Sequence, residues 1–142
     1  MTTVDEVTAK VQRILQNRGL FVELRGGEFW VPYESTRCRV SVKKFGTDKT
    51  VVDLAAIVLG DVKVTGKLLE YIGQRSSDFI FGNLALLHIE GQKEGIVIFR
   101  HAILGDYLDE EELMTSLAAV VTTADQLDDE LKAKFGGRRA ID

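Results

Sequence analysis

Apolar residues near the N-terminus recur every three or four positions, which is the spacing of one helix face. Thr3 and Glu6 have the spacing of a capping box, and Gly19 is a residue type that commonly follows a helix. We therefore expect a first helix between Thr3 and Gly19, with an apolar face formed by Val4, Val7, Val11, Ile14 and Leu15.

The next part of the chain changes to the two-residue period of β-strands. Short turns separate residues 20–25, 28–33, 37–45 and 50–59. In residues 37–45 an apolar set alternates with a polar set, formed by Arg37, Arg39, Ser41 and Lys43. Residues 50–59 are almost continuously apolar, which is typical of a central strand covered on both faces.

The second half of the chain repeats both patterns. Thr65 can cap a short helix that carries Leu68, Leu69 and Ile72, and residues 79–90 and 96–104 are expected to form a hairpin. Asp109 caps a last helix that runs to Phe135. The pattern predicts an α+β fold with an antiparallel sheet of about five strands, an N-terminal helix, a short middle helix and a long C-terminal helix. We expect one domain over residues 1–137 and a flexible tail at 138–142.

Composition restricts the classes of function. The 142 residues carry a formal net charge of −4, which argues against a nucleic-acid partner. No apolar run approaches the length of a membrane helix, the N-terminus lacks a secretory pattern, and Cys38 is the single cysteine, so we expect a cytoplasmic protein without a membrane partner. Charge is uneven: nine acids and no Lys or Arg lie between His101 and Leu131, whereas residues 37–49 hold five basic residues.

Catalytic and metal-binding patterns are missing from the sequence. The segment from Gly60 to Leu68 has five residues between its glycines and lacks the hydroxyl of a phosphate loop. His88 and His101 lie on two strands of one expected hairpin but do not face each other, and one cysteine with two histidines does not make a zinc site. We therefore expect no enzyme activity, no metal and no cofactor.

Two surfaces are candidates for binding. Pro32 cannot donate to a β-ladder on both sides, so residues 28–33 are expected to form an edge strand or to end in a bulge, where an extended peptide could pair. The candidate peptide-binding residues are Phe29, Trp30, Val31, Tyr33, Arg37 and Arg39. The alternative is that a helix covers this strand.

The last helix carries apolar residues at alternating spacings of four and three, which is a heptad seam. The candidate homodimer-interface residues are Leu113, Leu117, Val120 and Leu127. The alternative is that this seam packs on the sheet of its own chain.

The segment from His101 to Arg138, with ILGDYLDEEEL and TADQLDDEL, resembles the C-terminal signature of actinobacterial YbjN-like proteins. Upstream, RGGEFWVPYESTRCRVSVKKFGTDKTVVDLAAIVLGDV and FGNLALL are also similar to that family. It is grouped with type III secretion chaperones of the Tir-chaperone kind as a peptide-binding chaperone family (TY-Chap). The resemblance implies a helix–sheet–helix α+β fold, a cytoplasmic location, no cofactor and binding of an unfolded partner segment; related secretion chaperones are commonly homodimers. The alternative function is a structural or regulatory dimer that recognises itself or a folded partner.

Overall fold

A computed structural model describes residues 2–142 of the chain. In chain order the elements are α1 (Val4–Asn17), β1 (Glu23–Arg25), β2 (Glu28–Tyr33), β3 (Thr36–Phe45), β4 (Lys49–Lys63), α2 (Gly66–Arg75), a 3₁₀ turn (Ser76–Asp78), β5 (Asn83–His88), β6 (Glu94–Leu104) and α3 (Glu110–Phe135). The predicted α+β class and the three helices are confirmed, and the sheet has six strands where about five were expected.

All neighbouring strands of the sheet are antiparallel, in the order β1-β2-β3-β4-β6-β5. β4 and β6 form the centre, and β1 and β5 form the edges. The β5–β6 register pairs His88 with Gly95, and His101 pairs with Leu54 of β4, so the two histidines do not face each other.

Each helix begins at the residue that the sequence pattern predicted. The hydroxyl of Thr3 accepts a hydrogen bond from the Glu6 amide at 3.1 Å, and Thr65 does the same for Leu68 at 3.2 Å. The Asp109 carboxylate accepts from the Glu112 amide at 2.7 Å. Such caps satisfy backbone donors that a helix start leaves free, so local sequence fixes where each helix begins.

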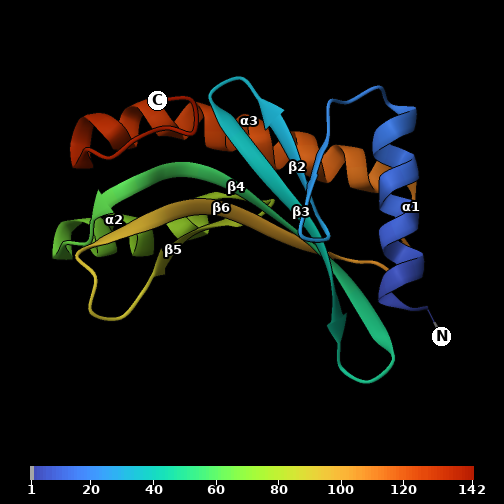
Figure 1. The fold of residues 1–142 in the computed structure, drawn as a ribbon. Helices are drawn as coiled ribbons and strands as arrows, with labels where there is room; N and C mark the ends of the chain where they lie inside the picture. Colours follow the sequence, from blue (N-terminus) through green and yellow to red (C-terminus); the bar gives the residue numbers. More distant parts are fainter. Residues whose placement is uncertain (1) are drawn as a thin grey trace.

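The three helices pack on one face of the curved sheet, where a single hydrophobic core forms (Figure 1). α1 contributes its predicted apolar face, α2 contributes Leu68 and Ile72, and the strands contribute large side chains such as Phe29, Leu54 and Phe99. Full burial of one such side chain stabilises the fold by about 1.5–3 kcal/mol.

The heptad seam of α3 lies inside this core. Leu113 and Val120 are fully buried, and Leu117 and Leu127 are nearly so. The candidate homodimer residues are therefore taken up by packing on the chain's own sheet, and this fold does not offer them to a second copy. A helix of 26 residues needs a long apolar stripe to cover β4 and β6, and that need alone explains the spacing.

The edge-strand prediction for residues 28–33 requires a correction. The three-residue strand β1 pairs with Glu28, Phe29 and Trp30, so β1 is the outer strand. No strand in the described part of the chain pairs with Val31, Pro32 and Tyr33 on that side. Pro32 thus lies where a missing backbone donor costs no ladder hydrogen bond, and half of β2 is an edge.

The tail also differs from expectation. Arg138 and Gly60 of β4 exchange two backbone hydrogen bonds, of 2.7 and 2.9 Å, and Asp142 accepts from Lys132 at 2.6 Å. Gly137 has a φ of 86°, and a side chain there would lie 2.8 Å from the Gly60 carbonyl oxygen. Residues 138–142, expected to be a flexible tail, are thus packed back on β4 and α3, through a glycine that permits the close approach.

No helix within residues 2–142 combines the length and the apolar character that a membrane crossing requires.

Candidate functional site

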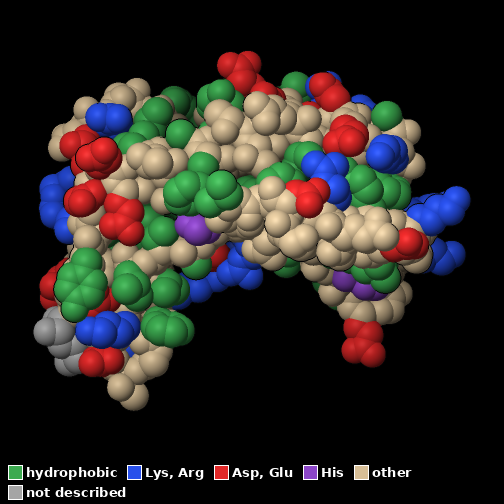
Figure 2. All heavy atoms as spheres, turned by 180° about the vertical axis from the view of Figure 1, so that it is seen from behind, with side chains coloured by type: hydrophobic (Ala, Val, Ile, Leu, Met, Phe, Trp, Pro, Cys, Tyr) green, Lys and Arg blue, Asp and Glu red, His purple; other side chains and the backbone are tan. Residues whose placement is uncertain are grey.

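The sheet face opposite the helices is not covered by any element of the described chain, and we call it the open face. Strand alternation places one residue of every two there, so β3 contributes Arg37, Arg39, Ser41 and Lys43 as the sequence predicted. As predicted, β4 is central and buried along most of its length on both faces; on the open side long neighbouring side chains, not a helix, cover it. Figure 2 shows the molecule from behind as an arch hollowed from below, with basic side chains visible in the hollow.

A buried acid with three basic neighbours forms the centre of the open face. Asp53 of β4 is 2% exposed, and its two carboxylate oxygens accept from three side chains: Arg100 at 2.8 Å, Lys43 at 3.2 Å and Arg39 at 3.4 Å. These cations come from β3 and β6, the two strands that flank β4. We call Arg39, Lys43, Arg100 and Asp53 the cation cluster.

Electrostatics hold the Asp53 carboxylate in its charged form. Burial would raise the pKa of Asp53, but the hydrogen bonds and positive charges of Arg100 and Lys43 outweigh it, and the pKa lies below its ordinary value. The cluster is therefore ionised at neutral pH. Two buried groups at the cluster, the Arg39 Nε and the hydroxyl of the neighbouring Ser41, have no hydrogen-bond partner among the described residues. Glu28 lies 3.7 Å from that Nε, beyond hydrogen-bonding distance.

The other half of the open face is apolar. Ile57, Ile98 and Ala85 lie across β4, β6 and β5 in one row, and Ile96 and Leu87 form the next cross-strand pair. Leu87 and Ile96 are 46% and 40% exposed, and they line a hollow of about 670 Å³ at the end of the β5–β6 hairpin, together with Ile89. We call Ile57, Leu87, Ile96 and Ile98 the apolar end. Adjacent exposed aliphatic side chains on a free sheet edge are typical of an interaction surface.

The structure divides the six predicted peptide-binding residues between two faces. Trp30, Arg37 and Arg39 lie on the open face, with Trp30 paired to Arg39 across β2 and β3. Phe29 and Val31 are buried in the core, so the prediction that they contact a partner is withdrawn. Tyr33 is partly exposed on the helix-covered side, because it shares the orientation of Phe29 and Val31.

Sequence reasoning missed the residues of β4, β5 and β6 in this site. Asp53 interrupts the apolar run of β4, and a lone acid in a buried strand is the signal that calls for a cationic partner. Arg100, Ile98 and Ile96 are two positions apart along β6, so they lie on the same face of the strand. The sequence does not show that β6, rather than β5, lies beside β4, so these residues could not be brought together from it.

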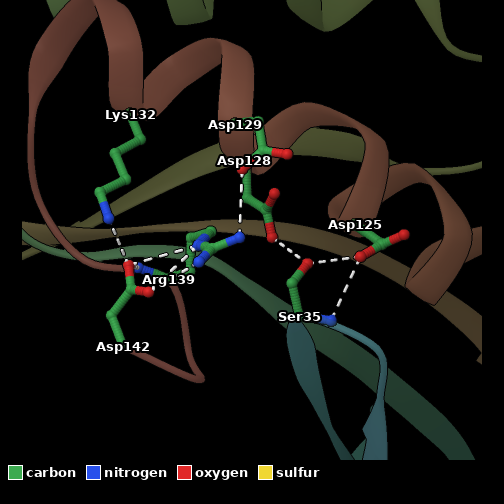
Figure 3. A network of polar contacts seen from close by, with 7 residues as sticks. All are labelled: Ser35, Asp125, Asp128, Asp129, Lys132, Arg139 and Asp142. Atoms are coloured by element: carbon green, nitrogen blue, oxygen red, sulfur yellow. Dashed lines mark hydrogen bonds and ion pairs between the residues drawn. The ribbon is translucent and has the colours of Figure 1, made fainter.

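A second polar group joins α3 to the β2–β3 turn on the covered side (Figure 3). The Ser35 hydroxyl contacts the carboxylates of Asp125 and Asp128, and the Ser35 amide donates to Asp125 at 3.2 Å. Burial, with the charges of Asp129 and Asp125, raises the pKa of Asp128 despite the Ser35 hydrogen bond. This group locks the turn onto α3, and we assign it a structural role.

Metal and thiol chemistry find no support in the geometry. The described residues contain no group of three or more His, Cys, Asp or Glu side chains arranged to hold a metal ion. Cys38 is fully buried on the core side of β3, and burial raises the pKa of its thiol to about 12. A thiol in that state is a poor nucleophile.

Comparison with known proteins identifies a family for this chain. Over residues 4–142 the chain matches the family model described as T3SS (YopN, CesT) and YbjN peptide-binding chaperone 1. No curated protein matches the sequence significantly.

Two of the solved structures that match this chain illustrate the shared fold. One is the crystal structure of the ExsC-ExsE complex, with a TM-score of 0.62 and 19% identity over 91% of this chain and 96% of the matched chain. The other is YbjN from E. coli, with a TM-score of 0.64 and 7% identity over 89% and 93% of the two chains. With the family match spanning almost every residue, the chain belongs to the T3SS and YbjN peptide-binding chaperone 1 family.

Proposed function

We propose that this protein is a non-enzymatic chaperone-like module that binds an extended or unfolded segment of a partner protein on its open face. The observation that carries the proposal is the uncovered side of the sheet, where Trp30 on β2 and the apolar end on β4, β6 and β5 share one face. Membership of a peptide-binding chaperone family supports the same function. A cytoplasmic location, expected from the single reduced cysteine, is part of the proposal.

The open face offers two kinds of contact to an extended chain. The Pro32 carbonyl at the outer edge of β2 faces no partner strand among the described residues and can accept a hydrogen bond from an added strand. Near the opposite edge of the sheet, apolar side chains of the partner can enter the hollow beside Leu87. Among the predicted residues, Trp30, Arg37 and Arg39 lie on the open face, which supports their role as contacts in this proposal, and Tyr33 lies on the other side of β2.

The test begins with proteins captured from the source cell, whose bound segments are mapped by mass spectrometry and then synthesised. Titration of such a segment should shift the NMR signals of Trp30, Ile57 and Ile96. The double substitution Leu87→Asp with Ile96→Asp should weaken binding at least about tenfold, because it places charge in the hollow. Leu69→Asp, which adds one negative charge rather than two, is the control, since Leu69 is 52% exposed on α2 of the covered side. Shifts confined to α1 and α3, or equal binding by all variants, would refute the proposal.

A dimer that recognises itself is the second function considered from sequence. It was motivated by the α3 seam and by the uneven distribution of charge, and the seam packs within the chain. We therefore retain no dimer surface on α3.

A further inference from the structure

We propose that the cation cluster is a binding site for an acidic side chain, Asp or Glu, of the segment that occupies the open face. This inference rests on the proposed function and adds the chemistry of the partner: an extended peptide in which an acid lies close to apolar residues.

The first argument is the charge of the cluster. Three cations surround one buried carboxylate, and both Asp53 oxygens are already engaged. The side chains of Lys43 and Arg100 nevertheless remain 51% and 44% exposed. Glu28 reaches only Arg39. The centre of the open face therefore keeps excess positive charge on a protein whose net charge is −4, and a concave surface of one sign attracts the opposite charge.

The second argument is unused hydrogen-bonding capacity at the same place. The Arg39 Nε and the Ser41 hydroxyl have no partner among residues 2–142, although both atoms are buried. Ser41 is paired with Asp53 across β3 and β4, so both atoms belong to the surroundings of the cluster. Arg100 uses only its Nη2 for Asp53 and its side chain is 44% exposed, so its remaining N–H groups can meet a planar carboxylate, which accepts two N–H groups at once.

The third argument is the order of residues along β6. Arg100, Ile98 and Ile96 follow one another on the open face at intervals of two residues. Two residues of an extended strand span roughly 7 Å, so a strand lying along β6 places side chains at the same interval. An acid on the cluster would then have apolar residues two and four positions away, which defines the expected pattern of the partner segment.

The experiment selects displayed random peptides of twelve residues on three forms of the full chain. The wild type is compared with a cluster variant, Arg39→Gln, Lys43→Gln, Arg100→Gln and Asp53→Asn, in which no buried carboxylate is left unpaired. The control is Arg13→Gln with Lys44→Gln: Arg13 is exposed on α1, and Lys44 lies on β3 but points to the other face. Both variants lose two units of positive net charge, because the first removes three cations and one anion and the second removes two cations.

We expect peptides selected on the wild type and the control to be enriched in Asp or Glu with apolar residues two and four positions away. The acidic enrichment should vanish on the cluster variant, while the apolar preference remains. Absence of acidic enrichment on the wild type, or its persistence on the cluster variant, would overturn the inference.

A second measurement uses the wild type alone and does not depend on the folding of a variant. Peptides without tryptophan, in Glu, Gln and Lys versions, are titrated against the emission of Trp30, the only tryptophan of the chain. The Glu version should bind about tenfold more tightly than the Gln version, since a hydrogen bond to a charged group is stronger than a neutral one, and the advantage should shrink at high salt. Equal binding of Glu and Gln versions would overturn the inference.

The outcomes also separate this inference from the proposed function. Apolar peptides that bind the open face without charge preference refute only the acidic site. Selected peptides that ignore the Leu87→Asp and Ile96→Asp substitutions refute the proposed function and the inference with it. An oligomer of the wild type that dissociates in the cluster variant would assign the cluster to the acidic start of α3 in a second copy, and would overturn the inference as well.

Discussion

The two faces of the sheet are built from the same strands and differ in what lies against them. On the covered face, Leu54 and Phe99 meet the apolar stripes of three helices, and that side forms the core. On the open face, their neighbours Asp53 and Arg100 contact each other, and Arg100 is also exposed to solvent. One alternating strand therefore encodes both stability and a surface for recognition. The covered face should tolerate little change, and the open face should tolerate much more.

The strongest test of this contrast is Leu113→Ala. It removes a fully buried side chain of α3 from the core, and we expect the free energy of unfolding to fall by about 2–5 kcal/mol. Leu104→Ala, on the open face with 44% exposure, should cost less than about 1 kcal/mol. Urea unfolding at several protein concentrations measures both. Equal losses would contradict the contrast between the two faces, and a loss for Leu113→Ala that depends on protein concentration would show that the seam contacts a second copy.

The α3 seam shows how far sequence reasoning reaches. Capping residues such as Thr3, Thr65 and Asp109 act on their own helix starts, so the helices could be predicted from local pattern alone. Packing between distant segments decides whether an apolar stripe contacts a sheet or another helix. The periodicity of one helix holds no information about those distant segments. The spacing of the seam is therefore compatible both with packing on the sheet and with a helix-to-helix dimer, and only the position of the sheet distinguishes them.

In the candidate site, too, local alternation could be predicted from the sequence, whereas contacts between distant strands could not. Alternation within β3 correctly assigned Arg37, Arg39 and Lys43 to one face. In β2 the same alternation puts Trp30 and Phe29 on opposite faces, but it does not say which of the two is buried, because that depends on where the helices dock. Asp53 and Arg100 are 47 residues apart, and only the β4–β6 pairing brings them together.

The cation cluster is the exception on the tolerant face, because it contains a buried charge. Asp53→Asn should lower the free energy of unfolding at pH 7 by about 1–3 kcal/mol, since it weakens three charge-assisted hydrogen bonds. The pKa of Asp53 is lower when folded than when unfolded. Its stabilisation is therefore complete above the unfolded value, about 3.9, and disappears as the pH falls through the folded value.

Urea unfolding at a series of pH values measures this effect. The difference between wild type and Asp53→Asn should be constant near neutrality and shrink below about pH 4. A difference that grows on acidification would contradict the assignment of Asp53 as an ionised, hydrogen-bonded group.

Asp128 is a buried polar residue on the covered side, and its pKa is raised where that of Asp53 is lowered. Ser35 has one hydroxyl proton but contacts two carboxylates, so it cannot donate to both. In Asp128→Asn the new amide can donate to Ser35, and one of the crowded negative charges disappears. We expect the free energy of unfolding at pH 7 to rise by about 1 kcal/mol.

The pH dependence of this gain follows from the raised pKa of Asp128. The wild type is penalised while Asp128 is ionised and recovers stability as the pH falls through that raised pKa, so the advantage of Asp128→Asn should shrink on acidification. Asp129→Asn, at an exposed neighbouring position, should change stability by less than about 1 kcal/mol. A gain for Asp128→Asn that persists at low pH would exclude relief of charge as its cause.

The variant with the smallest expected change in stability allows the solvent accessibility of the two faces to be compared directly. Cys38 lies on the covered face of β3, whereas Ala102 is exposed on the open face of β6, opposite Asp53. Ala102→Cys should alter the free energy of unfolding by less than about 0.5 kcal/mol. The introduced thiol should react with a maleimide as a free cysteine does, while Cys38 should react only as fast as the protein unfolds, because its thiol is buried and its pKa is raised. Binding of a partner segment should then protect the introduced thiol and leave Cys38 unchanged, which makes the labelling ratio a measure of whether the open face is occupied.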